Sequence, residues 1–418
     1  MALPSPVVAA AGAERKRARP FFEVADVVRA FAGEYLRTHR STGAQRRALR
    51  AIARCRTAAL GGHRQQCQGC GHERIAYNSC RDRHCPKCQG KERARWMAAE
   101  QAMLLPVPYF HLVFTLPHAL HALVRVNRRR LYGLLFRTAA ATLATFARDP
   151  RHLGAEPAVT MVLHTWGQTL TEHYHVHCVI SGGGLSPDGK SWIELPKGKK
   201  KRRHPFLFPV AALSRLFRGK FIAALERARK RGDLRFAGES APLAEAGPWQ
   251  AMLERLRSTP WVVYAKPPFG GPERVLKYLS RYTHRVAISD RRILFVGDGV
   301  VRFRYRDYAD HSRSKEMTLP ATEFIRRFLL HVVPRGFMRI RHYGITANCR
   351  RREKLTRCRE ILGQTQPAPS SEPDTAVPEA GDDNTVPRDS DAARCPSCGA
   401  PMRVVEIIPP VSAPHDTS

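Results

Sequence analysis

The sequence predicts an α+β fold, an antiparallel sheet with helices on one face. Helix-like and strand-like segments are mixed along its 418 residues without the regular alternation that a parallel sheet requires. Apolar, β-prone runs recur between polar breaks, as in Phe110–Leu116 and "AVTMVLHTWG". The segment "RILFVGDGVVRFRYRD" contains two such runs joined by Gly297-Asp298-Gly299, which is typical of a β-hairpin.

The N-terminal part predicts a disordered lead over 1–20 and a helical, zinc-binding module over 21–105. Apolar residues recur at helical spacing from Phe22 to Leu36. The stretch "STGAQRRALRAIARCR" predicts a second helix, with Ser41 or Thr42 as its N-cap. A third helix is expected in "KERARWMAAEQAMLL", residues 91–105.

Residues 106–360 predict the sheet domain. Its strands are expected at Phe110–Leu116, "AVTMVLHTWG", "HYHVHCVISGGG", "WVVYAK", "VAIS" and "RILFVGDGVVRFRYRD". Its helices are expected at 119–148, 210–231, 249–257 and over "KYLSRYTHR", Lys277–Arg285. The basic stretch "PKGKKKRRHPF", 196–206, is expected to be a charged loop, which either follows phosphates or is simply solvated.

The C-terminal part predicts an acidic linker over 361–394 and a short tail with a Cys-x2-Cys pair over 395–418. Residues 364–393 hold five prolines, seven acidic residues and one arginine, and almost no large apolar side chains. Such a segment cannot bury enough apolar surface to fold, so we expect it to be disordered.

The charge of the chain predicts a polyanionic partner. Lys and Arg number 70 against 36 Asp and Glu, a formal charge of +34. Nucleic acid fits best, because neutralised phosphates release counterions whatever the base sequence. No run of eighteen apolar residues indicates a membrane span, and the N-terminus lacks the pattern of a signal peptide. We therefore expect a cytoplasmic, nucleoid-associated bacterial protein without a membrane partner.

The cysteine-rich segment predicts a structural zinc site. Cys67-x2-Cys70 is followed after fourteen residues by Cys85-x2-Cys88. Two such pairs can bring four thiolates to one tetrahedral Zn²⁺. Cys80, His63, His72 and His84 are further candidates that the spacing leaves open. Cys395-x2-Cys398 is half a site, for which Cys349 and Cys358 are poorly spaced partners.

Two further motifs carry possible chemistry. His175 and His177 flank Val176 in a predicted strand, so both imidazoles face the same way and can bind one metal ion, or they are ordinary polar strand residues. His173 shares that face. Tyr278 and Tyr282 lie four apart on one helix face, as packed aromatic residues or as a pair of nucleophiles.

Four motifs in order resemble the two-tyrosine HUH transposases of the insertion sequence 91 family. They are the cysteine segment with "NSCRDRHCPKC", then "HLVFTLP", "EHYHVHCVISGG" and "WVVYAKPPFGGPERVLKYLSRYTHRVAIS". The resemblance implies an HUH-endonuclease-type sheet, with "HLVFTLP" as a central strand, behind an N-terminal zinc-binding domain. It implies that His175 and His177 bind the catalytic Mg²⁺ or Mn²⁺ and that Tyr278 and Tyr282 are the nucleophiles.

The resemblance also implies a third metal ligand upstream of the histidines. Gln168, seven residues before His175, is our candidate, and His164 or Glu172 could serve instead. Around the tyrosines, Lys277, Arg281 and Arg285 are expected to face DNA.

The activity implied is rolling-circle transposition. The enzyme would nick one DNA strand at an element end, become linked to its 5′ phosphate and rejoin the strand elsewhere. Single-stranded or hairpin DNA is the expected substrate, with bases stacking on aromatic residues such as Tyr305 or Trp166. The sequence has no G-x-x-x-x-G-K-[ST] loop, so unwinding would fall to a host helicase or to supercoiling. The alternatives are a plasmid-type replication initiator and a non-catalytic, zinc-containing DNA-binding protein.

Overall fold

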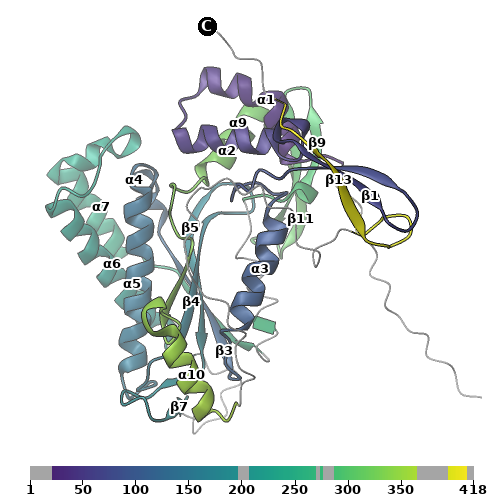
Figure 1. Cartoon of the computed structure of the whole chain (residues 1–418). Helices are drawn as coiled ribbons and strands as arrows, with labels where there is room; N and C mark the ends of the chain where they lie inside the picture. The colour runs from purple at the N-terminus through teal and green to yellow at the C-terminus, as the bar shows by residue number, and fades with distance from the viewer. Residues whose placement is uncertain (1–20, 196–206, 270–273, 276–286, 365–393, 412–418) are drawn as a thin grey trace, which may run out of the picture.

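A five-stranded antiparallel sheet forms the centre of the molecule (Figure 1). The computed structural model describes residues 21–195, 207–269, 274–275, 287–364 and 394–411. The strand order is β12-β4-β5-β3-β8, and every neighbouring pair is antiparallel. The strands are β3 (Tyr109–Thr115), β4 (Ala158–Trp166), β5 (Glu172–Ser181), β8 (Val263–Phe269) and β12 (Ile340–Gly344). The antiparallel sheet predicted from the sequence is confirmed.

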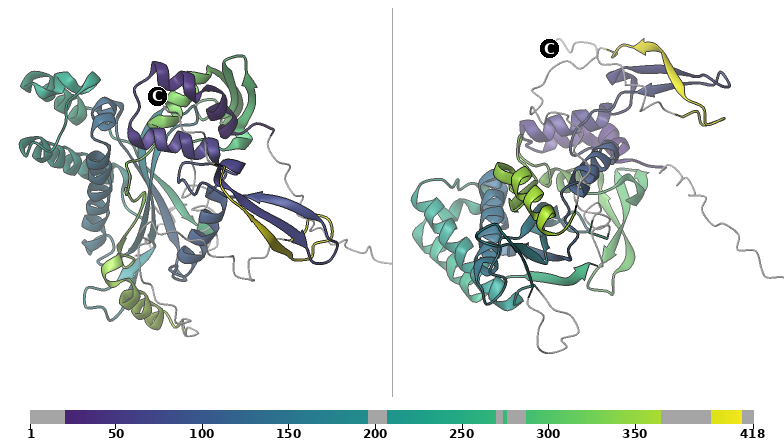
Figure 2. Two further views of the ribbon diagram at one scale, coloured as in Figure 1. Left: turned by 45° about the horizontal axis from the view of Figure 1, so that its top comes forward. Right: turned by 60° about the horizontal axis from the view of Figure 1, so that its bottom comes forward.

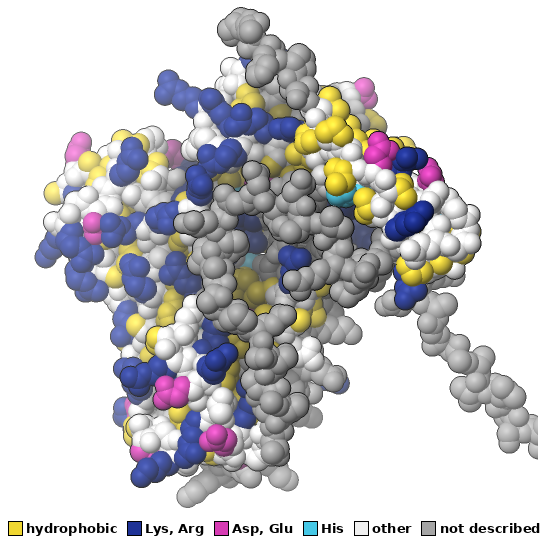
Figure 3. All heavy atoms as spheres, viewed as in Figure 1, with side chains coloured by type: hydrophobic (Ala, Val, Ile, Leu, Met, Phe, Trp, Pro, Cys, Tyr) yellow, Lys and Arg dark blue, Asp and Glu magenta, His cyan; other side chains and the backbone are white. Residues whose placement is uncertain are grey.

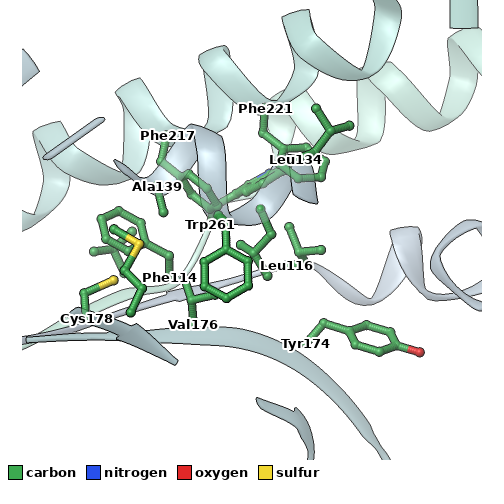
Figure 4. Packing of buried hydrophobic residues seen from close by; sticks show 14 of the residues in the cluster. Phe114, Leu116, Leu134, Ala139, Tyr174, Val176, Cys178, Phe217, Phe221 and Trp261 are labelled. Carbon is green, nitrogen blue, oxygen red and sulfur yellow. The ribbon is translucent and has the colours of Figure 1, made fainter. Parts of the chain in front are cut away.

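One face of this sheet carries the main hydrophobic core (Figure 4). Successive strand residues point to opposite faces, so Phe114 of β3 and Val176 and Cys178 of β5 lie together on this side. Phe217 and Trp261 pack on these side chains, and the centroids of their two rings lie 5.3 Å from each other. The covering helices are α5 (Arg128–Arg148), α6 (Val210–Lys230) and α7 (Ala246–Ser258). Each fully buried side chain of this size stabilises the fold by about 1.5–3 kcal/mol.

The helical segment predicted at 119–148 is two helices, α4 (His121–Val126) and α5. Asn127 separates them with φ −122° and ψ 30°, outside the helical region. Its amide Nδ2 donates to the carbonyls of Leu123 and Arg235. Asn side chains compete with the helix ladder for backbone groups, which accounts for the break at this residue.

Two more helices cover part of the opposite sheet face, although helices were predicted on one face only; the first of them corresponds to the helix predicted at 91–105. They are α3 (Gln89–Gln101) and α10 (Arg351–Ile361). Glu100 of α3 is 2% exposed, and its carboxylate lies 3.4 Å from Thr160 Oγ1 and from His342 Nε2. Burial raises the pKa of Glu100 to about 7. This cover lies at the Tyr109–Val179 end of the strands, away from the β4–β5 turn.

A second core joins the N-terminal helices to a later part of the chain. It combines α1 (Val24–Thr38) and α2 (Gly43–Arg54) with α9 (Ala321–Leu330) and the sheet of β9 (Ile293–Gly297), β10 (Val300–Asp307) and β11 (Arg313–Pro320). Thr42 caps α2 in a reciprocal box with Gln45, as one of the two predicted caps. Residues on both sides of the predicted boundary at 105/106 thus share one core.

The β9–β10 hairpin forms as predicted, but "VAIS" does not form a strand within its described residues. Asp298 and Gly299 have φ of 49° and 70°, the positive pair that a two-residue type I′ turn needs. Ala287 and Ile288 form a bend instead and are buried in the second core. Ala287 and Ile288 are thus buried although they do not form a strand.

A three-stranded ribbon projects from the body (Figure 2). Its order is β13-β1-β2, with β1 (Gly62–Cys67), β2 (Glu73–Tyr77) and β13 (Met402–Ile408). The C-terminal segment predicted as a separate short tail therefore contributes a strand, β13, to the sheet of β1 and β2. The remaining elements are β6 (Gly183–Leu185), β7 (Trp192–Glu194) and 3-10 helices at Ala58–Leu60, His118–Leu120, Gly238–Ala244, Asp290–Arg292 and Asn348–Arg350.

None of the helices in the described part of the chain has the length and apolar character to cross a membrane.

Candidate metal centre and cysteine clusters

Three histidines converge on one face of the central sheet, near the β4–β5 turn. The register of β4 and β5 sets His164 directly opposite His175, and His177 follows two residues later on the same face. One ring nitrogen of each lies within 4.8 Å of the other two. All three side chains are buried, with exposed fractions of 8% or less. We call these residues the histidine trio.

The hydrogen bonds of the histidine trio determine which nitrogens can bind a metal. His175 Nδ1 lies 2.8 Å from the His173 carbonyl and must donate to it, so its neutral ring presents an unprotonated Nε2. That Nε2 lies 3.1 Å from Nε2 of His177. On the far side of the ring, His177 Nδ1 lies 2.9 Å from His111 Nε2.

A neutral imidazole carries one N–H, so this chain has two consistent proton arrangements. In one, His111 donates to His177, which donates to His175. In the other, His177 donates its Nδ1–H to His111 and presents a lone pair at Nε2. The second arrangement aims two Nε2 lone pairs at one point, which is what a divalent cation requires. The residues present therefore fit a metal ion.

Lowered pKa values keep these rings neutral, which is the state that binds metal. Burial lowers the pKa of His175 and His177 well below the ordinary value. It lowers the pKa of His111 to about 3, helped by the nearby charge of Lys266. These imidazoles are neutral at physiological pH, and the neutral form is the one that coordinates metals.

The side chain of His164 joins the pair of His175 and His177, whereas the predicted ligand Gln168 makes other contacts. Gln168 Nε2 donates to Tyr308 Oη at 3.2 Å, and its Oε1 accepts from Arg306 N at 3.4 Å. Its side chain is thus turned to β10. The ring of His164 stacks on Trp166 with centroids 4.7 Å apart and joins the histidine pair.

Glu172, the other alternative, is engaged elsewhere, in a 2.6 Å ion pair with Arg125 and a hydrogen bond from Tyr174. The register of a hairpin between the two predicted strands was the sequence signal that could have found His164. With the turn near Gly167–Thr171, His164 falls opposite His175.

The predicted nucleophiles Tyr278 and Tyr282 lie outside the described residues, and so do Lys277, Arg281 and Arg285. The residues on either side are described. Val275 is fully buried in a cluster with Tyr109 and Val179, which share the sheet face of the histidine trio. Ile288 is buried in the second core, which includes Leu170 of the β4–β5 turn.

The predicted grouping of Cys67, Cys70, Cys85 and Cys88 in one site is wrong. Cys85 and Cys88 meet Cys55 and Cys80 in one cluster, with Cys88 Sγ 3.5 Å from the sulfurs of both Cys55 and Cys80. Hydrogen bonding from Cys80 and Cys85 lowers the pKa of Cys55 to about 7. We call these four the inner cluster.

Cys67 and Cys70 belong to an outer cluster with Cys395 and Cys398. The hairpin of β1 and β2 carries them to the tip of the ribbon, away from Cys85. Of the four further candidates, Cys80 joins the inner cluster and the three histidines join neither cluster. His84 is occupied by Asp82 and by the backbone N–H of Val333. No spacing rule connects Cys70 with Cys395, so each half could be recognised from the sequence but the two could not be paired.

Comparison with known proteins identifies the family to which the chain belongs. Residues 158–354 match the family described as "Putative transposase", and residues 27–116 match the family described as "Transposase zinc-binding domain". A putative transposase, y4qJ, of Sinorhizobium fredii (strain NBRC 101917 / NGR234) is 50% identical over 395 residues, 94% of this chain and 97% of that protein. The chain is a transposase of the insertion sequence 91 family.

A second relative of the transposase is more distant. The transposase for insertion sequence element IS801 of Pseudomonas savastanoi pv. phaseolicola is 28% identical over 351 residues, 83% of this chain and 80% of that protein. A solved structure of TrwC complexed with a 27-mer DNA is 14% identical over 41% of this chain and 71% of that chain, with a TM-score of 0.20. That likeness is too slight to bear on the fold.

The two matched ranges contain most of the sites described above. The histidine trio lies within 158–354, and the inner cluster lies within 27–116. Cys395 and Cys398 of the outer cluster lie outside both ranges.

Proposed function

We propose that the transposase cuts and rejoins single DNA strands at element ends, with Tyr278 and Tyr282 as nucleophiles and a divalent metal ion at the histidine trio. The observation that carries the proposal is the pair of Nε2 atoms of His175 and His177, 3.1 Å apart and both able to present lone pairs. These nitrogens belong to buried, neutral imidazoles on one face of the sheet, and the neutral form is the one that coordinates metals. The imidazole pair is therefore suited to bind a cation that contacts a phosphate group.

The chemistry proposed is two transesterifications. The phenol oxygen of one tyrosine attacks the phosphorus and loses its proton to a base, while the P–O3′ bond breaks and the leaving oxygen is protonated. The products are a 5′-phosphotyrosine ester and a free 3′-hydroxyl. A later 3′-hydroxyl attacks that ester, restores the phosphodiester and releases the phenol. A bound Mn²⁺ or Mg²⁺ would polarise the phosphate and stabilise the charge that develops on it.

The residues that flank the tyrosine segment support this arrangement. Val275 is anchored at the Val179 level of the sheet, and Ile288 belongs to the core that includes Leu170. Along β5, the positions of His177 and His175 lie between these two levels. The described residues on either side of the tyrosine segment are therefore both anchored in buried clusters, which supports tyrosines placed near the histidine trio.

The surface charge favours a nucleic acid substrate. Lys and Arg side chains outnumber acidic ones on the face shown in Figure 3, in keeping with the formal charge of +34. Phosphate contacts of this kind bind DNA without reading its sequence and weaken with salt. We propose single-stranded or hairpin element ends as the substrate, freed by a host helicase or by supercoiling.

Covalent capture tests the proposal. The full chain is incubated with Mn²⁺ and a single-stranded oligonucleotide that contains an element end, and adducts are resolved on a denaturing gel. The wild type is expected to form a protein–DNA adduct, and the Tyr278→Phe/Tyr282→Phe double variant none, with unchanged DNA binding. Tyr308→Phe, an exposed tyrosine far along the chain, serves as the matched control. Adducts in the double variant, or none in the wild type with any element-end DNA, would overturn the proposal.

A further inference from the structure

We propose that the outer cluster of Cys67, Cys70, Cys395 and Cys398 is a second structural zinc site, which fastens the C-terminal strand to the N-terminal ribbon. Half of its ligands lie beyond the zinc-binding domain matched at 27–116. The transposase would therefore carry two zinc ions, of which one joins segments more than 300 residues apart.

The sulfur positions fit a tetrahedral ion. Cys67 Sγ lies 3.4 Å from Cys398 Sγ, and Cys70 Sγ lies 3.7 Å from Cys395 Sγ. A Zn–S bond of about 2.3 Å implies sulfurs about 3.8 Å apart around a tetrahedron. A disulfide would need about 2.05 Å between the two sulfurs, far less than either distance. The contacts cross between the two chain segments, so an ion at their centre would bind both.

The two halves of the outer cluster have the same backbone geometry. Cys67 N donates to the His72 carbonyl at 2.9 Å, and Cys395 N donates to the Ala400 carbonyl at 2.8 Å. Each half ends in a glycine of positive φ, Gly71 at 71° and Gly399 at 79°. The N–H of each glycine donates to the carbonyl of the first cysteine, at 3.2 Å and 3.0 Å.

Backbone N–H groups also point at the sulfurs. Gly69 N and Cys70 N donate to Cys67 Sγ at 3.3 Å and 3.5 Å, and Ser397 N donates to Cys395 Sγ at 3.4 Å. Such bonds stabilise thiolates, the form that binds metal. Two copies of one turn, "CQGCG" and "CPSCG", thus face each other as a matched pair of metal-binding knuckles.

Few buried apolar side chains stabilise the described part of the ribbon. Its buried apolar cluster consists of Cys67, Cys395 and Met402, with Ala400 packed against them. Ile75 and Ile407 are more than half exposed. A two-stranded hairpin is marginal alone, and three strands need a hydrophobic face or another source of stability. Metal binding supplies that stability in small domains of this kind.

The outer cluster is also the more accessible of the two. Cys70 and Cys398 are exposed, whereas the inner cluster has three buried cysteines and one half-buried. Chelators and oxidants should therefore remove the outer zinc first, while the inner ion stays with the second core.

Metal content of the purified full chain tests the number of sites. Elemental analysis is expected to give two zinc ions per wild-type chain and one in the Cys395→Ser/Cys398→Ser variant. Cys349→Ser, an exposed cysteine outside both clusters, is the control and should retain two. One zinc in the wild type that the double variant retains, iron in place of zinc, or a Cys67–Cys398 disulfide would each overturn the proposal.

A second measurement does not depend on how the variant folds. A protease site is inserted between residues 364 and 394 of the otherwise unaltered chain and cleaved under native conditions. The C-terminal fragment is expected to remain bound to the body and to dissociate when a strong zinc chelator is added. Release of the fragment before chelation, or its retention once all zinc is removed, would contradict a zinc fastening.

Discussion

His177 Nδ1 lies 2.9 Å from His111 Nε2, on the opposite side of the His177 ring from His175. His111 is 1% exposed and comes from the neighbouring strand β3. Its Nε2 can accept the His177 Nδ1–H, and that acceptance frees Nε2 of His177 for a metal. In the proposed metal site, His111 would thus be a positioning residue that does not itself bind the metal.

His111→Phe is expected to weaken metal binding because it removes this acceptor while keeping a planar ring. The loss of such a partner typically lowers metal affinity by about 10- to 100-fold. A Mn²⁺ titration of DNA cleavage should show a higher half-saturating concentration, with activity restored at high Mn²⁺. His111→Gln, which supplies an acceptor oxygen, should recover part of the affinity, and His152→Phe on the other sheet face should leave it unchanged. An equal loss of activity at every Mn²⁺ concentration would indicate a purely structural role.

His164→Ala is expected to abolish metal-dependent cleavage, whereas Gln168→Ala should leave most of it. The ring of His164 joins the pair of His175 and His177, while the amide of Gln168 bonds Tyr308 and Arg306. The two variants are compared by Mn²⁺ binding calorimetry and by the adduct assay, with DNA affinity as the control. Loss of Mn²⁺ binding in Gln168→Ala alone would instead make Gln168 the third ligand.

Mn²⁺ is expected to support cleavage at lower concentration than Mg²⁺. The site offers three imidazole nitrogens, and Mg²⁺ prefers oxygen ligands, so a difference of about tenfold or more is expected between their half-saturating concentrations. Titration of each ion in the adduct assay measures it. Equal or tighter dependence on Mg²⁺ would imply an oxygen ligand beyond the histidine trio.

Local patterns in the sequence predicted the central sheet well. In the β-prone runs that became β3, β4 and β5, successive side chains point to opposite faces of the sheet, and nearly all of them are buried. Asp298-Gly299 has the residue types that its turn requires. His175 and His177 share a face for the same reason. These features depend on neighbours in the chain, which a sequence displays directly.

Contacts between distant segments could not be predicted in the same way. Cys67 and Cys85 have ideal spacing for one zinc site, yet each found partners that spacing does not reveal, Cys395 in one case and Cys55 in the other. The ribbon also has its third strand only because β13 pairs with β1. Such pairings depend on the path of the whole chain between the segments.

The stability of the fold is expected to fall between pH 6.5 and pH 4 through His331. This ring joins α9 to the β4–β5 turn: Nε2 donates to the Leu170 carbonyl at 3.0 Å, and Nδ1 accepts from Thr165 Oγ1 at 3.2 Å. Burial lowers the pKa of His331 to about 4. The unfolded chain, with an ordinary pKa of about 6.5, then binds a proton that the folded chain does not.

The contribution of His331 is therefore complete above pH 6.5 and is lost as the pH falls towards 4, by about 1.4 kcal/mol per pH unit. His331→Gln keeps a donor and an acceptor but does not titrate. Urea denaturation at pH 7 and pH 5 should show that the wild type loses about 2 kcal/mol more free energy of unfolding than the variant between these values. The same loss in both proteins would mean that His331 does not resist protonation in the folded state, and that other buried histidines, such as His121 and His342, account for the acid sensitivity.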